Sequence, residues 1–249
     1  MNPQIENIKR YSKELRLKYI YQNIDCESED ARNPLEFLQN MLEQEYILKL
    51  DTSKKNRIRN ARFPFNKLLE DLNYEKLPKD AQEKLGQLET LKFIENNQNI
   101  ILSGVPGTGK THIAIGLGIK ACNSGFKTLF TTTTALINKL KESRSQKTLQ
   151  IMERQFLNYD LIIIDELGYI SFDKEGSELL FSHLSLRAER KSTIITTNLK
   201  FNKWHEIFKD PLMTTAMVDR LTHKSFLIDM DGDSYRLYET LKMITWFFW

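Results

Sequence analysis

A short run of residues, from Gly104 to Thr111, has the types and spacing that bind phosphate groups. It matches the pattern G-x-x-x-x-G-K-[ST] and lies between a predicted strand and a predicted helix. Backbone N–H groups turn inward in such a loop, and the helix adds its positive end, so phosphate oxygens bind there. We expect Lys110 to reach the β- and γ-phosphates, the Thr111 hydroxyl to bind Mg²⁺, and His112 to flank the nucleotide. The predicted nucleotide site is Gly104, Val105, Pro106, Gly107, Thr108, Gly109, Lys110, Thr111 and His112.

Two adjacent carboxylates follow the apolar run from Leu161 to Ile164. Asp165 at the strand tip is suited to hold Mg²⁺, and Glu166 is suited to accept a proton from an attacking water or to orient it. The chain between Lys110 and this strand leaves room for one βα unit, so the strand can lie close to the loop. A buried strand with a solvated acidic turn is the alternative, and the phosphate loop disfavours it. The sequence therefore predicts binding of ATP or ADP with Mg²⁺, and hydrolysis of ATP.

Two further polar residues are candidates for the reaction. Asn198 ends the run Thr196-Thr197-Asn198 after the next predicted strand, where its side chain can touch the γ-phosphate or the water. A turn or helix-capping asparagine is the alternative. Arg220 could act on the ATP of a neighbouring subunit and stabilise transition-state charge. An ion pair with Asp219 or another acid of the same chain is the alternative, and the sequence alone favours it.

The elements that must position these residues begin near residue 96. Strands are expected at 100–102, 128–132, 161–164, 193–197 and 226–230, and helices at 110–123, 135–157, 176–190 and 213–222. This alternation predicts βαβ units and a parallel sheet, whose ligands bind at the carboxyl ends of the strands. The phosphate loop, the carboxylate pair and Asn198 all fall at such ends.

Residues 1 to about 95 have a polar, helical pattern. Apolar residues recur at helical spacing after Asn33-Pro34, which suits a helix start. The stretch from Lys49 to Arg62 is locally basic, and clustered cations gain DNA affinity by releasing counterions. Phe63-Pro64-Phe65 then breaks the helix. The candidate DNA contacts are Lys54, Lys55, Arg57 and Arg59, and a solvated helix face is the alternative.

Composition narrows the class of protein. A net charge of only +3 excludes a strongly basic histone-like protein and still allows a local DNA-binding patch. Cys26 and Cys122 lie far apart without metal-ligand spacing, so we expect reduced thiols and neither a disulfide nor a metal site. No apolar run approaches the ~20 residues that span a bilayer, and no signal peptide is visible. We expect a cytoplasmic protein with no membrane partner.

Several motifs together resemble the IstB/DnaC-like group of AAA+ ATPases, and more closely its IstB-type members, which help transposition of insertion sequences. The resemblance covers nearly the whole chain, and the phosphate loop alone would indicate only an NTPase. The motifs are PLEFL at 34–38, EY at 45–46, ARFPF at 61–65, FIEN at 93–96, THIA at 111–114, YDLIIIDELGY at 159–169, STIITTN at 192–198, Trp204, DRLTH at 219–223 and GDSYRL at 232–237.

The resemblance implies an α/β fold with an AAA+ P-loop NTPase core in three α/β/α layers. Its five parallel strands would follow the order 5-1-4-3-2, after a small helical N-terminal domain. Glu166 would activate water, Asn198 would be the sensor-1 residue, and Arg220 the arginine finger of a homo-oligomer, supplied in trans. Such proteins bind double-stranded DNA and cooperate with a transposase. DnaC-type members load a replicative helicase instead, which is the alternative function, and ATP binding without useful turnover is a third.

The expected domains are a helical N-terminal domain for partners or DNA over 1–76, a linker and lead-in over 77–95, the ATPase core over 96–240, and a tail over 241–249. Relatives often end in a basic tail, whereas this chain ends in an aromatic one from Met243 to Trp249. An altered terminus and a partner-docking tail are both compatible with it. The lid that usually supplies a sensor-2 arginine is missing or vestigial in this pattern, and Arg236 could substitute. A small-molecule kinase would need an acceptor pocket, of which the sequence gives no sign.

Overall fold

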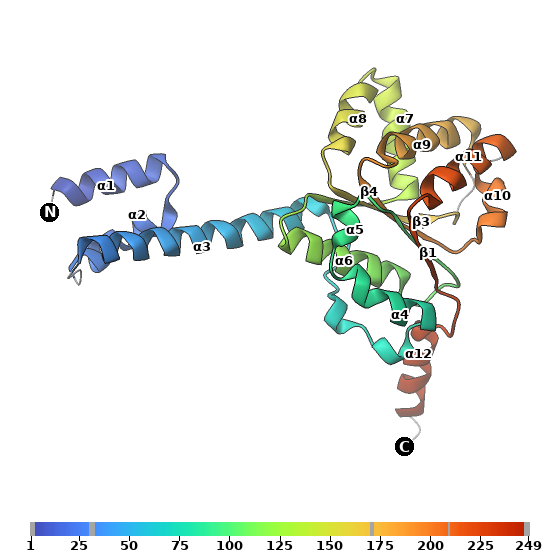
Figure 1. The fold of residues 1–249 in the computed structure, drawn as a ribbon, viewed down its shortest axis with the longest axis horizontal. Helices are drawn as coiled ribbons and strands as arrows, with labels where there is room; N and C mark the ends of the chain where they lie inside the picture. Colours follow the sequence, from blue (N-terminus) through green and yellow to red (C-terminus); the bar gives the residue numbers. More distant parts are fainter. Residues whose placement is uncertain (1–2, 30–32, 170–171, 209, 247–249) are drawn as a thin grey trace. The chain divides into compact units, whose positions relative to one another are not determined.

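The computed structural model describes residues 3–29, 33–169, 172–208 and 210–246, and the chain forms two compact units (Figure 1). The N-terminal unit covers residues 1–56 and the core unit covers residues 57–249. The sequence placed a domain boundary at residue 76, and the structure divides the chain between Asn56 and Arg57 instead. Within the described ranges, no helix combines the length and apolar character needed to cross a membrane.

The described residues of the N-terminal unit form three helices: α1 (Pro3–Glu14), α2 (Lys18–Glu29) and most of α3 (Pro34–Ala61). Helix α3 begins at Pro34, as the Asn-Pro pair predicted, and ends two residues before Phe63. A small hydrophobic cluster around Ile20, Ile24 and Met41 joins the helices. The buried carboxylate of Glu45 accepts hydrogen bonds from the backbone N–H groups of Lys18, Tyr19 and Ile20, at distances of 3.0, 2.6 and 3.2 Å. Glu45 thereby caps the first turn of α2.

The core unit contains a five-stranded parallel sheet in the order β2-β3-β4-β1-β5. The strands are β1 (Ile100–Ser103), β2 (Thr128–Thr132), β3 (Leu161–Leu167), β4 (Ser192–Thr197) and β5 (Phe226–Asp229). This confirms the predicted order, read from the opposite edge. Strands β1, β3 and β4 are buried on both faces along most of their length, as parallel strands covered by helices require.

Helices cover both faces of the sheet and complete three layers (Figure 1). One layer packs against the side chains of Ile100, Leu102 and Ile163, and the other against Ile101, Ile162 and Ile195. The first layer holds α4 (Lys79–Leu88), α5 (Lys92–Glu95) and α6 (Lys110–Asn123). The second layer holds α7 (Thr133–Ser145), α8 (Leu149–Leu157), α9 (Lys174–Arg187), α10 (His205–Phe208) and α11 (Pro211–Thr222). A last helix, α12 (Tyr235–Trp246), follows β5.

The segment from Phe63 to Leu77 packs against α6 and contains two short 3-10 helices, η1 (Leu69–Asp71) and η2 (Tyr74–Lys76). Two glycines of α6 allow the close approach. A Cβ on Gly116 would lie 2.5 Å from Leu69 Cδ2, and a Cβ on Gly118 would lie 2.8 Å from Phe63 Cε1. The phenyl ring of Phe63 also meets that of Phe130 edge-on, with centroids 6.4 Å apart. This segment therefore belongs to the packed core and forms a wall along α6.

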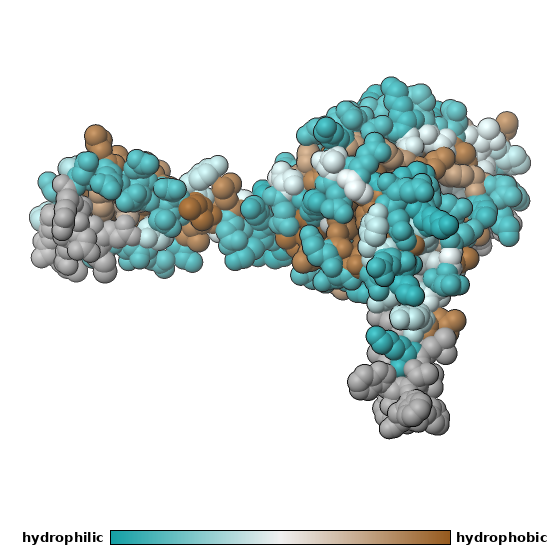
Figure 2. Space-filling model, turned by 60° about the horizontal axis from the view of Figure 1, so that its bottom comes forward, coloured by the Kyte–Doolittle hydropathy of each residue, from teal (hydrophilic) through white to brown (hydrophobic). Residues whose placement is uncertain are grey.

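Several predicted elements differ in extent from the observed ones. The helix expected over 135–157 is two helices, α7 and α8, because Lys147 between them has a φ of 57° that no α-helix accepts. The expected linker over 77–95 contains α4 and α5. The expected tail from residue 241 begins inside α12, and residues 247–249 lie outside the described part. Over the face of the core unit seen in Figure 2, most residues are hydrophilic, and hydrophobic ones form narrow patches between them.

Candidate nucleotide-binding and catalytic site

The phosphate loop joins the carboxyl end of β1 to the first turn of α6. Gly109 is the N-cap of α6 with a φ of 93°, and Gly107 has a φ of 87°. A side chain is strained in this region of backbone space, so both positions require glycine. At Gly107 an added Cβ would also lie 2.1 Å from Ser234 Oγ. The loop therefore has the tight curl that turns its N–H groups toward a phosphate.

The ammonium group of Lys110 is buried in this loop. Its Nζ donates to the carbonyl oxygens of Gly104 and Val105, at 2.7 and 2.6 Å. Burial lowers the pKa of Lys110 to about 8, because the charged form loses its hydration. The carboxylates of Asp165 and Asp231 act in the opposite direction, and the Arg236 guanidinium adds to the lowering. A triphosphate would replace the two carbonyls with charged oxygens and favour the ammonium form.

Thr111 and Asp165 bring hard oxygen ligands together beside the loop. The Thr111 hydroxyl donates to the buried Asp165 carboxylate, at 3.0 Å from Oδ1 and 3.3 Å from Oδ2. Hydroxyl and carboxylate oxygens next to a phosphate site are the ligands that Mg²⁺ prefers. The residues present therefore fit Mg²⁺, which Thr111 and Asp165 would hold.

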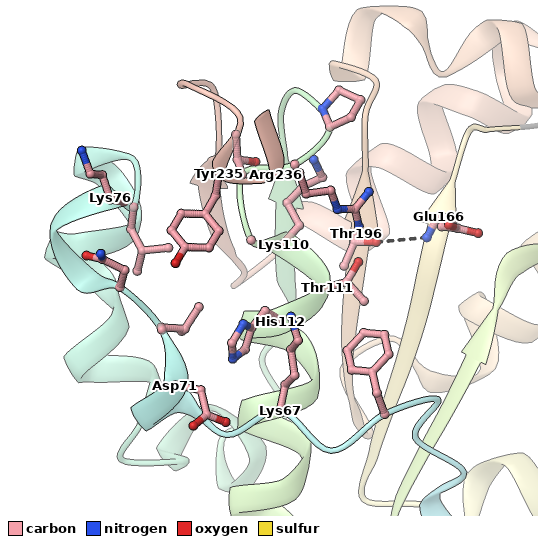
Figure 3. Close-up of a pocket in the computed structure, with 18 of the residues that line it drawn as sticks. Lys67, Asp71, Lys76, Lys110, Thr111, His112, Glu166, Thr196, Tyr235 and Arg236 are labelled. Carbon is pink, nitrogen blue, oxygen red and sulfur yellow. Dashed lines mark hydrogen bonds between the residues drawn. The ribbon is translucent and has the colours of Figure 1, made fainter. Parts of the chain in front are cut away.

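Glu166 leaves the regular path of β3. The pairing of β3 with β4 shifts register between Ile164 and Leu167, and Glu166 has a φ of 63°. This conformation is costly for a residue with a side chain, so neighbouring contacts must hold it. Its backbone N–H donates to the hydroxyl of Thr196 at 3.0 Å (Figure 3). The Glu166 side chain is consequently exposed at the pocket, one residue after the buried Asp165.

Thr196 joins the two acids. Its buried hydroxyl accepts from the Glu166 backbone and donates to Oδ1 of Asp165. The Asp165 carboxylate thus receives two hydroxyl groups, one from α6 and one from β4. The sequence singled out Asn198 on this strand end. The structure places Thr196 in the pocket wall and Asn198 beyond it.

The connection between β5 and α12 crosses the phosphate loop. The Val105 N–H donates to Asp231 Oδ1 at 3.2 Å, and the Tyr235 N–H donates to the Gly107 carbonyl oxygen at 3.0 Å. Lys200 pairs with Asp231 at 2.9 Å, and this hydrogen bond lowers the pKa of Asp231. The connection delivers Arg236 into the pocket, near Lys110 (Figure 3). Two backbone positions of the loop are therefore fixed from the far end of the sequence.

These elements enclose a cavity of about 490 Å³, large enough for a nucleotide. The predicted loop residues from Pro106 to His112 line it together with Glu166. The Nε2–H group of His112 also donates a hydrogen bond to the Leu68 carbonyl oxygen, 2.7 Å away, which ties α6 to the wall. The other lining residues are Phe65, Asn66, Lys67, Asp71, Leu72, Asn73, Lys76, Leu77, Tyr169, Thr196, Tyr235 and Arg236.

Two predicted catalytic residues lie outside this lining. Asn198 is half-buried, and its side-chain oxygen is buried without a hydrogen-bond donor among the described residues. Arg220 is exposed on α11, where it donates to Ser185 Oγ at 2.9 Å and lies 4.9 Å above the ring of Phe181. The roles of sensor and arginine finger stay predictions for these two residues.

The four candidate DNA contacts of α3 have different surroundings. Lys54, Lys55 and Arg59 are exposed, and Lys55 pairs with Asp51 at 2.7 Å. Arg57 is half-buried and donates from Nε to the Cys122 carbonyl oxygen at 2.6 Å, near the end of α6. Arg57 therefore has a structural partner within the core unit, and the DNA-binding role of the group stays a prediction.

The sequence did not reveal three parts of the site. They are the wall from Phe63 to Leu77, the hydroxyl of Thr196, and the contacts of Asp231 and Tyr235 with the phosphate loop. The GDSYRL motif at 232–237 was a signal for the last part, since it contains Ser234, Tyr235 and Arg236. No comparable signal marked Leu72 or Leu77, which lie far from the catalytic motifs along the chain.

Comparison with known proteins agrees with this geometry. Residues 12–243 match the family described as IstB-like ATP binding protein. The chain is 36% identical over 204 residues to an ATP-binding protein of insertion sequence IS5376 from Geobacillus stearothermophilus, covering 82% of this chain and 81% of that protein. It is 34% identical over 232 residues to an ATP-binding protein of insertion sequence IS21 from Pseudomonas aeruginosa, covering 92% and 88%.

Solved structures show the same fold at lower identity. The crystal structure of DnaI superposes with a TM-score of 0.56 at 16% identity, covering 71% of this chain and 93% of that one. AMPPCP-bound DnaA from Aquifex aeolicus superposes with a TM-score of 0.55 at 18% identity, covering 72% and 55%. These likenesses extend the agreement from motifs to the arrangement of the sheet and its helices.

Proposed function

This chain belongs to the family of IstB-like ATP-binding proteins, and on this basis we propose that it hydrolyses ATP while assembling on double-stranded DNA to assist a transposase. Membership of the family and the AAA+ fold make it an ATP-binding protein of the P-loop ATPase class. The proposal adds four properties to this class: hydrolysis of ATP, binding to double-stranded DNA, cooperation with a transposase, and assembly of several copies.

The observation that carries hydrolysis is the pair Asp165 and Glu166. Asp165 is buried and held by two hydroxyl groups, whereas Glu166 is exposed at the pocket one residue later. In the proposed reaction, Glu166 takes a proton from a water that attacks the γ-phosphorus as the bond to the ADP oxygen breaks. The products are ADP and phosphate.

The phosphate loop binds and orients the triphosphate in this scheme. Its N–H groups and the Lys110 ammonium face the phosphate oxygens, and Lys110 moves from its carbonyl partners to these oxygens. Mg²⁺, when held by Thr111 and Asp165, supplies positive charge to the phosphates. Arg236 adds a cation of the same chain at the pocket and takes the place of a sensor-2 arginine.

An arginine from a neighbouring copy completes the site in this proposal. Arg220 lies outside the pocket lining of its own chain and is exposed, so a second copy can receive its guanidinium. A cation that meets the γ-phosphate only in the assembled state makes turnover depend on oligomerisation. Asn198 directly follows β4, close to Thr196 in the chain, and would contact the attacking water or the γ-phosphate as the sensor-1 residue.

The transposition role is supported by the relatives, which are named as ATP-binding proteins of insertion sequences. DNA binding is supported by the exposed cations Lys54, Lys55 and Arg59 of α3. Clustered cations bind phosphate backbones with little regard to sequence, which suits a protein that must accept many targets.

One experiment tests the core of the proposal. Phosphate release is measured for the purified full chain with Mg–ATP, with and without double-stranded DNA, and the particle size is measured in the same samples. We expect turnover that rises with DNA and with assembly, and that is lost in Glu166→Gln while ATP binding remains. Glu83→Gln, at an exposed position of α4, is the matched control.

Two results would contradict the proposal in different ways. Equal inactivity of wild type and Glu166→Gln with DNA present would leave an ATP-binding protein without turnover. Stimulation by a replicative helicase, and none by a transposase encoded beside this chain, would favour the helicase-loading alternative.

A further inference from the structure

The peptide bond between Asp165 and Glu166 is held from both sides by threonine hydroxyls. The Thr133 hydroxyl donates to the Asp165 carbonyl oxygen at 3.0 Å. The N–H group of the same peptide, on Glu166, donates to the Thr196 hydroxyl at 3.0 Å, as the dashed line in Figure 3 shows. Both threonines are buried, with 0% and 2% of their surface exposed, so water competes little for either contact. Each polar group of this peptide therefore has a side-chain partner from a neighbouring element.

Regular pairing of the sheet is interrupted at this peptide. Strand β2 pairs with β3 as far as Thr132 opposite Asp165, and Thr133 then begins α7. The register of β3 with β4 shifts between Ile164 and Leu167, where one extra residue of β3 is accommodated. Such a bulge re-aims a side chain and leaves the extra residue without regular pairing. The two hydroxyls thus lie where the strand ladders are interrupted.

The backbone at Glu166 needs this support. Its φ of 63° lies in the left-handed region, which is costly for a residue with a side chain and persists only where surrounding contacts enforce it. The N–H group of Glu166 belongs to the held peptide, so a rotation of the peptide plane would change this φ directly. The direction in which the Glu166 side chain leaves the backbone consequently depends on the two hydroxyls.

The two hydroxyls come from different elements, and each element is fixed independently of this peptide. Thr133 is the first residue of α7, and the helix is capped by the Thr132 hydroxyl, which accepts from the Ala135 N–H at 3.2 Å. Thr196 belongs to β4, the middle strand of the sheet. Loss of the Thr133 hydroxyl should therefore free the peptide without displacing α7.

We propose that Thr133 is a positioning residue for ATP hydrolysis, and that it acts together with Thr196 to keep the Glu166 carboxylate aimed at the attacking water. This role rests on the proposed function, in which Glu166 takes a proton from that water. Thr133 is outside the lining of the nucleotide cavity, so it reaches the reaction only through the peptide that it holds. A proton acceptor that is fixed before the reaction begins loses no rate to reorientation.

Phosphate release with Mg–ATP and double-stranded DNA, and calorimetric binding of Mg–ATP, test this role in the full chain. Thr133→Val keeps the shape and removes the donor, and it is expected to lower kcat by about tenfold or more while KM and ATP affinity stay unchanged. Thr133→Ser keeps the hydroxyl and is expected to restore kcat. Thr128→Val, at a buried position at the other end of β2, is the matched control and is expected to keep the wild-type kcat.

A double variant tests whether the two hydroxyls act on the same peptide. Thr133→Val combined with Thr196→Val is expected to lower kcat by less than the product of the two single losses, because the first substitution already frees the peptide. Independent losses that multiply would show that Thr133 and Thr196 serve different groups, and they would overturn the joint action of the two residues.

The remaining outcomes separate the role of Thr133 from the proposed function. Turnover by wild type together with an unchanged kcat in Thr133→Val would overturn the role of Thr133 and leave the proposed function standing. Equal losses of kcat and ATP affinity would assign the hydroxyl to the shape of the nucleotide site and also overturn its positioning role. An inactive wild type would overturn the proposed hydrolysis itself. If Thr133→Val fails to fold, Thr133→Cys, which has a similar size and only a weak donor, takes its place with the same expected loss.

Discussion

Two charged groups at the nucleotide pocket are buried and hydrogen-bonded within the chain, whereas the cations on the outer surface are exposed to solvent. Beside the pocket, Asp165 is buried and hydrogen-bonded by Thr111 and Thr196, and the Lys110 ammonium in the pocket lining is held by two carbonyls. On the surface, Lys54 and Arg220 are exposed. Buried charges must have partners within the chain, whereas exposed charges can also meet another molecule, even where they touch a neighbour as Arg220 touches Ser185. The pocket should therefore respond to changes as a network, and the outer cations should respond only when the partner molecule is present.

The largest expected effect comes from Arg220. If it serves the site of a neighbouring copy, Arg220→Ala should lower turnover by about 10³-fold or more and leave ATP affinity unchanged, because the guanidinium stabilises charge only in the transition state. Phosphate release and calorimetric ATP binding measure the two effects. Arg190→Ala, at an exposed position in the turn after α9, is the matched control.

Mixing variants sharpens the same prediction. Arg220→Ala subunits have an intact pocket without a finger, and Lys110→Ala subunits have an intact finger without a functional pocket. A mixture of the two should regain part of the turnover if the arginine acts between copies. Loss of ATP binding by isolated Arg220→Ala would instead place the residue within the nucleotide site of its own chain.

The next largest effect is expected at Thr196. Thr196→Val keeps the shape and removes the hydroxyl, so the Glu166 N–H loses its acceptor and Asp165 loses a donor. A buried group left without its partner costs about 1–3 kcal/mol, so kcat should fall by roughly tenfold or more while KM changes little. Thr196→Ser should restore kcat. Thr128→Val, at a buried position of the edge strand β2 and outside the pocket lining, should leave turnover intact.

The choice between Thr196 and Asn198 shows how far a sequence can determine a site. The phosphate loop and the carboxylate pair were predictable, because a motif fixes their local backbone and the strand fixes their position. Which residue of Thr196-Thr197-Asn198 faces the pocket depends on the pleat of β4 and on the register shift beside Glu166. These features arise from pairing between strands, which no short window of sequence contains.

The position of the wall from Phe63 to Leu77 also depends on contacts between segments that are distant in the sequence. The parallel order of the sheet was predictable from the resemblance, whereas the wall is placed by packing against Gly116 and Gly118 of α6. A glycine inside a helix signals close approach without naming the partner. The sequence therefore identified the phosphate end of the pocket and left the opposite end undetermined.

A moderate effect is expected from pH. The pKa of Lys110 is lowered to about 8 in the free protein, mainly by burial, and bound phosphates must raise it again. Binding then takes up a proton above pH 8, so Mg–ATP affinity should fall by up to about tenfold per pH unit as the pH rises beyond that value. Calorimetry between pH 7 and 9.5 measures the slope. Lys110→Arg keeps its charge throughout and should give a flatter profile, whereas equal slopes would show that another group titrates.

The smallest effect is expected in the basic part of α3. Lys54→Gln with Lys55→Gln should weaken binding to double-stranded DNA severalfold and reduce the slope of log affinity against log salt by up to about 2, since each phosphate contact releases counterions. Both lysines are exposed, so thermal stability should stay unchanged. Fluorescence anisotropy at several salt concentrations measures the slope.

Arg57→Gln provides the contrast within the same helix. Its Nε donates to the Cys122 carbonyl oxygen, so its removal should lower the melting temperature and leave the salt slope nearly unchanged. If the lysine pair and Arg57 instead changed DNA affinity equally and stability not at all, Arg57 would act as an outer cation despite its partner. An unchanged salt slope in the lysine pair would mean that DNA meets a different surface, and that these cations serve only to solvate the helix.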